Sequence, residues 1–181
     1  MDINTGKLDS QFIESPNFDD RPENTDPELI VIHNISLPPN EFGGPWITAL
    51  FCNNLDPEAH PYFKDIYQMR VSSHVLIRRN GEIIQFVPFH KRAWHAGQSY
   101  YNGRGQCNNF SIGIELEGSD QQAFEPPQYQ QLSKLAHLLI NSYPTLSDQH
   151  ITGHSDIAPG RKTDPGPFFD WTKFSQLLTK L

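Results

Sequence analysis

The hydrophobic positions of the chain form short β-rich runs in its earlier part and helical stripes toward its C-terminus. Residues 28–33 (ELIVIH) form an apolar, β-branched run that predicts a buried strand. The runs 72–79 (SSHVLIRR) and 82–89 (EIIQFVPF) flank Asn80-Gly81. They predict a hairpin, because Asn-Gly favours the tight turns that join antiparallel strands.

Residues 110–118 (FSIGIELEG) alternate with the period of two that is typical of a strand. Ile112, Ile114 and Leu116 point to one face, and Gly113, Glu115 and Glu117 point to the other. A brief final strand is predicted at 150–154 (HITGH). The pattern therefore predicts several short strands.

Pro126-Pro127 begins the first long predicted helix, because proline is favoured in a first helical turn. Its apolar stripe consists of Tyr129, Leu132, Leu135, Ala136, Leu139 and Ile140. Residues 168–181 predict a terminal amphipathic helix, and a short helix is expected from Ile47 towards Leu55.

The remaining segments are polar or rich in proline and glycine. Residues 1–27 are polar and aperiodic, so we expect an irregular arm laid over a single domain at 28–181. Residues 36–46 and 92–109 are predicted as loops. The expected fold is mixed α/β (α+β), with a central mixed β-sheet flanked by helices and several loops at one end of the strands.

Length and charge narrow the classes of function. A length of 181 residues indicates one domain. The net charge is -7 and no basic run stands out, which argues against a nucleic-acid partner. The first residues lack the pattern of a signal peptide, and no run approaches the roughly 20 apolar residues of a membrane span. We expect a cytoplasmic protein, a monomer, that binds neither nucleic acid nor membrane. Cys52 and Cys107 are expected to be free thiols, and Cys107 is not favoured as a nucleophile.

Residues 152–167 (TGHSDIAPGRKTDPGP) concentrate ionisable groups in a stiff segment. They hold one histidine, two aspartates and an Arg-Lys pair among three prolines and three glycines. The segment is either a solvated loop with ordinary turn chemistry or part of a site that needs its side chains at fixed places.

A metal site is one such possibility. His33 ends a predicted strand, His154 ends another, and Asp164 follows ten residues later. Two imidazoles and one carboxylate suit Zn²⁺ better than Mg²⁺ or Ca²⁺ and leave a position for water. The alternative is that His33 and His154 are hydrogen-bonded structural residues, because eight histidines offer many such triples.

Two further residues fit the chemistry of a zinc hydrolase. Glu115 could be a general base that takes a proton from water, although Glu115 and Glu117 could equally both face solvent. Lys162 stands two residues before Asp164 and could stabilise a developing oxyanion, or be a surface lysine.

Four long motifs resemble the zinc-dependent N-acetylmuramoyl-L-alanine amidases of the type-2 class, which share their fold with peptidoglycan recognition proteins. They are VIHNISLPP, SSHVLIRRNGEIIQFVPFHKRAWHAG, CNNFSIGIELEG and TGHSDIAPGRKTDPGP, in the family's order. The resemblance runs from about Pro27 to the C-terminus and is closest to the cytosolic amidases of 1,6-anhydro-muropeptides.

The resemblance implies a role for each of the five residues. His33, His154 and Asp164 take the zinc-ligand positions, Glu115 the catalytic acid/base position and Lys162 the position that stabilises the transition state. His74 and His95 also lie in family motifs. We interpret His74 as a structural or outer-shell residue and His95 as a pocket wall, because a fourth protein ligand would close the metal to water.

The implied substrate is a muropeptide, in which an anhydromuramic sugar carries a peptide that begins with L-alanine. Arg70 matches a basic position for a diaminopimelate carboxylate. Trp94 can stack on the sugar and Asn34 can hydrogen-bond the peptide. Gln106 stands where the family often has arginine before the cysteine, and Arg104 could substitute for it.

The implied reaction is zinc-dependent hydrolysis of the amide between the lactyl group and L-alanine, in peptidoglycan recycling. Two alternatives stay open. One is a muropeptide-binding module without catalysis, and the other is a lytic amidase that acts on intact peptidoglycan.

Overall fold

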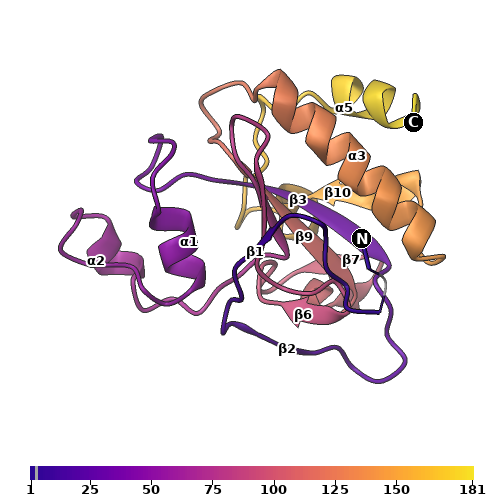
Figure 1. Ribbon diagram of the computed structural model, residues 1–181, viewed down its shortest axis with the longest axis horizontal. Coiled ribbons are helices and arrows are strands. Elements are labelled where there is room, and N and C mark those ends of the chain that lie inside the picture. Colours follow the sequence, from indigo (N-terminus) through magenta and orange to yellow (C-terminus); the bar gives the residue numbers. More distant parts are fainter. Residues whose placement is uncertain (3) are drawn as a thin grey trace.

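The computed structural model describes residues 1–2 and 4–181 and has a mixed β-sheet at its centre (Figure 1). The six strands of this sheet lie in the order β1-β5-β4-β9-β3-β10. Its strands are β1 (Gln11–Phe12), β3 (Leu29–Ile35), β4 (Val75–Ile77), β5 (Ile83–Gln85), β9 (Ser111–Glu117) and β10 (Ile151–Gly153). β4 and β5 are antiparallel, and the other neighbouring strands are parallel. The predicted fold class and the hairpin around Asn80-Gly81 are confirmed.

Helices and two small strand pairs complete the fold. The helices are α1 (Trp46–Phe51), α2 (Phe63–Ile66), α3 (Pro126–Ser142), α4 (His154–Ile157) and α5 (Trp171–Leu178), with 3-10 turns at Cys107–Asn109 and Asp148–His150. β2 (Phe18–Asp20) pairs with β6 (Lys91–Ala93), and β7 (Tyr100–Tyr101) pairs with β8 (Arg104–Gly105). Within the described residues, no helix combines the length and apolar character needed to cross a bilayer.

The largest core lies between the sheet and the two long helices. α3 and α5 lie side by side over one face of the sheet (Figure 1). The aliphatic face of β9, with Ile112, Ile114 and Leu116, is fully buried in the same cluster as Leu132 and Leu139 of α3. The predicted alternation of β9 and the predicted stripe of α3 are therefore confirmed. The terminal helix begins at Trp171 rather than at 168. Asp170 caps its start, because the Asp170 side chain accepts a hydrogen bond from the Lys173 amide.

The other face of β9 is not exposed to solvent. Glu117 is buried, accepts a hydrogen bond from Arg78 Nη1 at 2.9 Å and accepts another from the Gly43 amide at 2.7 Å. It therefore fastens the loop at 36–46 to the sheet. Glu115 is buried as well, so the alternative in which Glu115 and Glu117 both face solvent is wrong. The sequence could not exclude it, because the loops that cover this face come from distant parts of the chain.

Two segments predicted as irregular contain short strands. Residues 1–27 contribute β1 to the central sheet and β2 to a pair with β6. The predicted loop at 92–109 contains the end of β6 and the β7–β8 pair. These strands are two or three residues long, which is too short for a period of two to be visible in the sequence.

Arg21 attaches the N-terminal segment to the domain. Its guanidinium donates to the carbonyls of Asn108, Asn109, Phe89 and Ser111 at 2.9–3.2 Å. Burial lowers the pKa of Arg21 to about 10, so it is still charged at neutral pH. The four carbonyls replace the water that this charge loses on burial.

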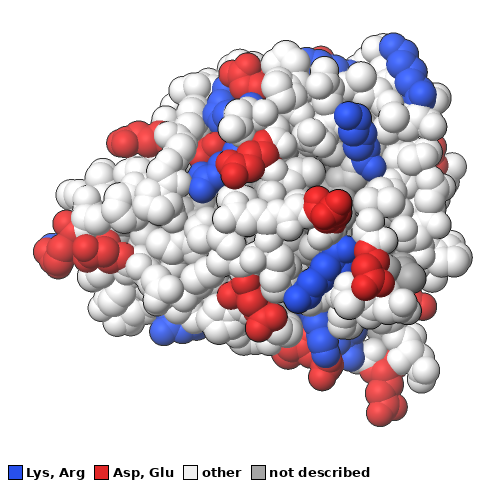
Figure 2. All heavy atoms as spheres, viewed as in Figure 1, with Lys and Arg blue, Asp and Glu red and all other residues white. Residues whose placement is uncertain are grey.

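On the face drawn in Figure 2, the charged residues of the described chain mix both signs. In the sequence, Asp and Glu outnumber Lys and Arg by 21 to 14, which gives the net charge of -7.

Candidate metal centre

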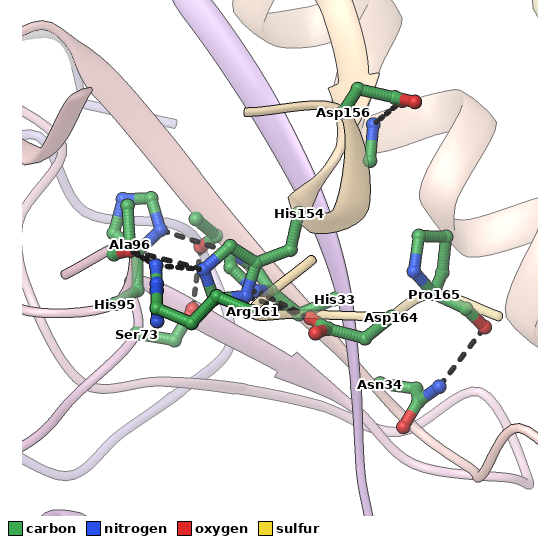
Figure 3. A network of polar contacts seen from close by, with 12 residues as sticks. His33, Asn34, Ser73, His95, Ala96, His154, Asp156, Arg161, Asp164 and Pro165 are labelled. Atoms are coloured by element: carbon green, nitrogen blue, oxygen red, sulfur yellow. Dashed lines mark hydrogen bonds and ion pairs between the residues drawn. The ribbon is translucent and has the colours of Figure 1, made fainter. Parts of the chain in front are cut away.

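Three side chains from two neighbouring strands and one loop meet at one point. His33 lies near the end of β3, His154 directly follows β10, and Asp164 lies in the loop after α4. His33 Nδ1, His154 Nδ1 and Asp164 Oδ2 are each 3.0 Å from the other two. Figure 3 shows the three side chains converging from their separate elements. β10 pairs in parallel with β3, so the carboxyl ends of both strands present their histidines at the same edge of the sheet.

These three atoms fit a zinc ion. Zinc ligands lie about 2.0–2.2 Å from the ion, so ligand atoms at tetrahedral corners are separated by about 3.3 Å. The observed separation of 3.0 Å is close to that value. A donor set of two nitrogens and one carboxylate oxygen is typical of a catalytic zinc site, which keeps one corner for water or substrate. Among the described residues, this is the one group of this kind.

The surroundings bury the two imidazoles and fix their orientation. His33 and His154 are 1 % and 2 % exposed. Burial lowers the pKa of His33 to about 4, so its ring is uncharged at neutral pH, as a metal ligand must be. His154 Nε2 lies 3.0 Å from the Ala96 carbonyl, which can only accept a hydrogen bond (Figure 3). His154 Nε2 therefore donates to this carbonyl, and Nδ1 is the ring atom that faces Asp164.

Glu115 lies beside this point on the neighbouring strand. β3 and β9 are parallel, and His33 is directly opposite Glu115 in their register, so the two side chains share a face of the sheet. Glu115 is 8 % exposed, and its Oε2 has no hydrogen-bond partner in the described part of the chain. Burial, and secondly the charge of Asp164, raises the pKa of Glu115 well above its usual value. A buried carboxylate without a partner has the basicity that proton transfer requires.

The site opens into a cavity of about 340 Å³. All five predicted catalytic and metal residues line it, and so do Asn34, Trp94 and His95. The Asn34 side-chain amide is already engaged, because Nδ2 donates to Asp120 Oδ1 at 2.7 Å and to the Pro165 carbonyl at 3.0 Å. His74 does not line the cavity and is fully buried beneath it, where Nδ1 accepts from the Gly113 amide at 3.0 Å.

The predicted arginines and Gln106 are not brought to this cavity. Arg104 pairs with Glu28, lies over the ring of Phe110 and lines a different cavity. Gln106 is exposed on the same loop. The Arg70 side chain is exposed and donates to the Gln68 carbonyl, although its chain neighbours line the cavity.

The sequence did not indicate the apolar wall of the cavity. This wall consists of Leu50, Phe51, Tyr62, Ile66 and Met69, from α1, α2 and the turns beside them. Tyr62 and Met69 are 39 % and 46 % exposed, so part of their apolar surface is open to a ligand in the cavity. Sequence pattern alone could not find them, because a short helix has too few residues for a clear apolar stripe.

Comparison with known proteins identifies the family. The profile of the N-acetylmuramoyl-L-alanine amidases (Amidase_2) matches residues 23–167. The 1,6-anhydro-N-acetylmuramyl-L-alanine amidase AmpD of Escherichia coli K12 is 60 % identical over 168 residues, 93 % of this chain and 91 % of AmpD.

Two solved structures agree. A crystal structure of selenomethionine AmpD superposes with a TM-score of 0.95 at 57 % identity and covers 98 % of this chain and 99 % of that one. The second is the E. coli amidase AmiD, solved with the substrate anhydro-N-acetylmuramic acid-L-Ala-D-γ-Glu-L-Lys. It superposes with a TM-score of 0.61 at 32 % identity, and the match covers 87 % of this chain and 60 % of the AmiD chain. The chain therefore belongs to the N-acetylmuramoyl-L-alanine amidase family, and it is an amidase.

Proposed function

We propose that the protein hydrolyses the amide bond between the lactyl group of 1,6-anhydro-N-acetylmuramic acid and L-alanine, with Zn²⁺ held by His33, His154 and Asp164. The observation that carries this proposal is the meeting of three ligand atoms at 3.0 Å beside the unpartnered carboxylate of Glu115. The substrate class is supported by the names of AmpD and of the AmiD complex.

A zinc ion held by these three residues would act as a Lewis acid toward a water molecule and the scissile carbonyl. Glu115 takes a proton from the attacking water as the new C–O bond forms. It then gives that proton to the amide nitrogen as the C–N bond breaks. The buried position of its Oε2 suits both transfers, because no group in the described part of the chain is hydrogen-bonded to that oxygen.

Lys162 lines the same cavity. Its positive charge lowers the pKa of both His33 and Glu115, an effect secondary to burial, and this supports a position of the ammonium group near the reacting atoms. A cation in this position stabilises the negative oxygen of the tetrahedral intermediate. The role of Lys162 in this proposal is therefore electrostatic, while Glu115 moves the proton.

The cavity walls suit a glycopeptide. The Trp94 ring is fixed, because its Nε1 donates to Asp19 Oδ1 at 3.2 Å, and a fixed indole face can pack against a sugar ring. The apolar wall from α1 and α2 can contact methyl groups of the lactyl and alanyl units. On the family resemblance, we place the reaction in the cytoplasm, in peptidoglycan recycling, and we propose that the enzyme acts as a monomer.

Replacing the proposed acid/base tests the chemistry. We expect Glu115→Gln to lower kcat by about 10²–10⁴-fold, the usual contribution of a positioned acid or base. Zinc content, measured on the purified variant by atomic emission, should equal that of the wild type, since Glu115 is not among the three ligands. A variant with undiminished kcat would remove Glu115 from the mechanism and would favour a different base.

Lys162→Ala tests the electrostatic role. Loss of one oxyanion-stabilising group typically costs about 10²–10³ in rate, so we expect kcat to fall by that factor. Lys180→Ala near the C-terminus is the matched control and should keep wild-type kinetics, because Lys180 is exposed and does not line the cavity. Unchanged turnover in Lys162→Ala would contradict the proposal.

A comparison of two substrates distinguishes an enzyme of peptidoglycan recycling from a lytic amidase. Soluble 1,6-anhydro-muropeptides and intact sacculi are offered side by side, and release of peptide amino groups is followed over time. We expect faster release from the soluble fragments. Faster release from sacculi would support the lytic alternative, and binding without release from either would support the non-catalytic one.

A further inference from the structure

We propose that His95 and Ser111 form a hydrogen-bonded relay that fixes the tautomer and orientation of His33 and thereby sets the zinc affinity of the site. This inference rests on the proposed role of His33 as a zinc ligand. It assigns His95 a positioning role in addition to its place in the cavity wall.

The relay is continuous and buried. His33 Nε2 lies 2.9 Å from His95 Nδ1, and His95 Nε2 lies 3.0 Å from Ser111 Oγ. Ser111 Oγ lies 2.6 Å from the Cys107 carbonyl oxygen. Ser111 and Cys107 are 0 % exposed, so no solvent enters the far end of the relay.

The Cys107 carbonyl determines the direction of every proton in the relay. A carbonyl only accepts, so Ser111 donates its hydroxyl proton to Cys107 and receives one from His95 Nε2. His95 Nδ1 is then unprotonated, and its lone pair accepts a hydrogen bond from His33 Nε2. A neutral His33 with its proton on Nε2 has an unprotonated Nδ1, the atom that faces His154 and Asp164. The reverse direction would set two oxygen lone pairs against each other at 2.6 Å.

The position of the His95 ring is set by close packing. The ring lies directly on Gly113 of β9, where an added Cβ would be 2.4 Å from His95 Cγ. The backbone amides of His95 and Ala96 both donate to Asn108 Oδ1, at 3.1 and 2.7 Å. Arg21 in turn holds the Asn108 carbonyl. The absence of a side chain at Gly113 therefore provides the space that the relay occupies.

The same two residues serve both ligand histidines. His33 is oriented by the His95 ring, and His154 is oriented by the Ala96 carbonyl at 3.0 Å (Figure 3). Each ligand ring thus donates its outer N–H to a fixed acceptor in one dipeptide. Outer-shell partners of this kind typically change metal affinity by about 10–100-fold when they are removed.

Ser111→Ala tests the relay without touching substrate, because Ser111 does not line the cavity. Its matched control is Ser73→Ala, which removes an equally buried hydroxyl that donates to the Gly113 carbonyl at 2.7 Å outside the relay. Zinc affinity is measured by competition with a chelator. We expect it to fall about 10-fold in Ser111→Ala and to stay at the wild-type value in Ser73→Ala.

The His33 tautomer gives a second readout that does not depend on activity. In the metal-free protein, ¹⁵N chemical shifts should show the His33 proton on Nε2 in the wild type and a share of it on Nδ1 in Ser111→Ala. His95→Leu should lose zinc affinity further, while His95→Asn should recover much of it, because Asn Oδ1 can accept in place of Nδ1. This pair keeps the test decisive if Ser111→Ala is poorly folded.

The relay proposal is overturned if Ser111→Ala and His95→Leu bind zinc as the wild type does and His33 keeps its tautomer. Higher KM with unchanged zinc affinity in His95→Leu would also overturn it and leave His95 a pocket wall only. Failure of the metal site itself is recognised separately, because His33→Ala would then bind zinc with wild-type affinity.

Discussion

Three hydrogen-bond acceptors held 3.0 Å apart in a buried position are the constraint on which the rest of this structure depends. His154 Nε2 donates to the Ala96 carbonyl, so Nδ1 is the ring atom that faces the carboxylate of Asp164. Such a cluster repels itself unless a cation lies between its members. The loop from 158 to 167, with its prolines and glycines, and the strand ends beside it hold the cluster in place.

The parallel sheet assembles the proposed active site around these three atoms. Parallel strands end at the same edge, so β3, β9 and β10 deliver His33, Glu115 and His154 to one place from positions far apart in sequence. The helices α3 and α5 cover the opposite face and supply the core. Residues of α1 and α2 form one wall of the cavity. The N-terminal segment is attached to the rest of the fold by β1, β2 and Arg21.

The sequence predicted those features that depend on the local pattern of residues. Alternation in 110–118 placed Glu115 opposite an aliphatic face, and the spacing from His154 to Asp164 was short enough to suggest a shared ligand set. It could not choose this triple from the other histidines without the family resemblance. It also could not place Arg104, which the fold directs toward Glu28. Nor could it show the His95 relay, because which partner each ring nitrogen meets depends on packing against Gly113.

The account's central claim is that one zinc ion in the His33, His154, Asp164 cluster is required for amide hydrolysis. The most direct test measures zinc content and hydrolysis of an anhydro-muropeptide on the same sample before chelation, after chelation and after zinc is restored. The account predicts about one zinc per chain, loss of hydrolysis with loss of the ion, and recovery of both together. Full hydrolysis by metal-free protein would contradict it.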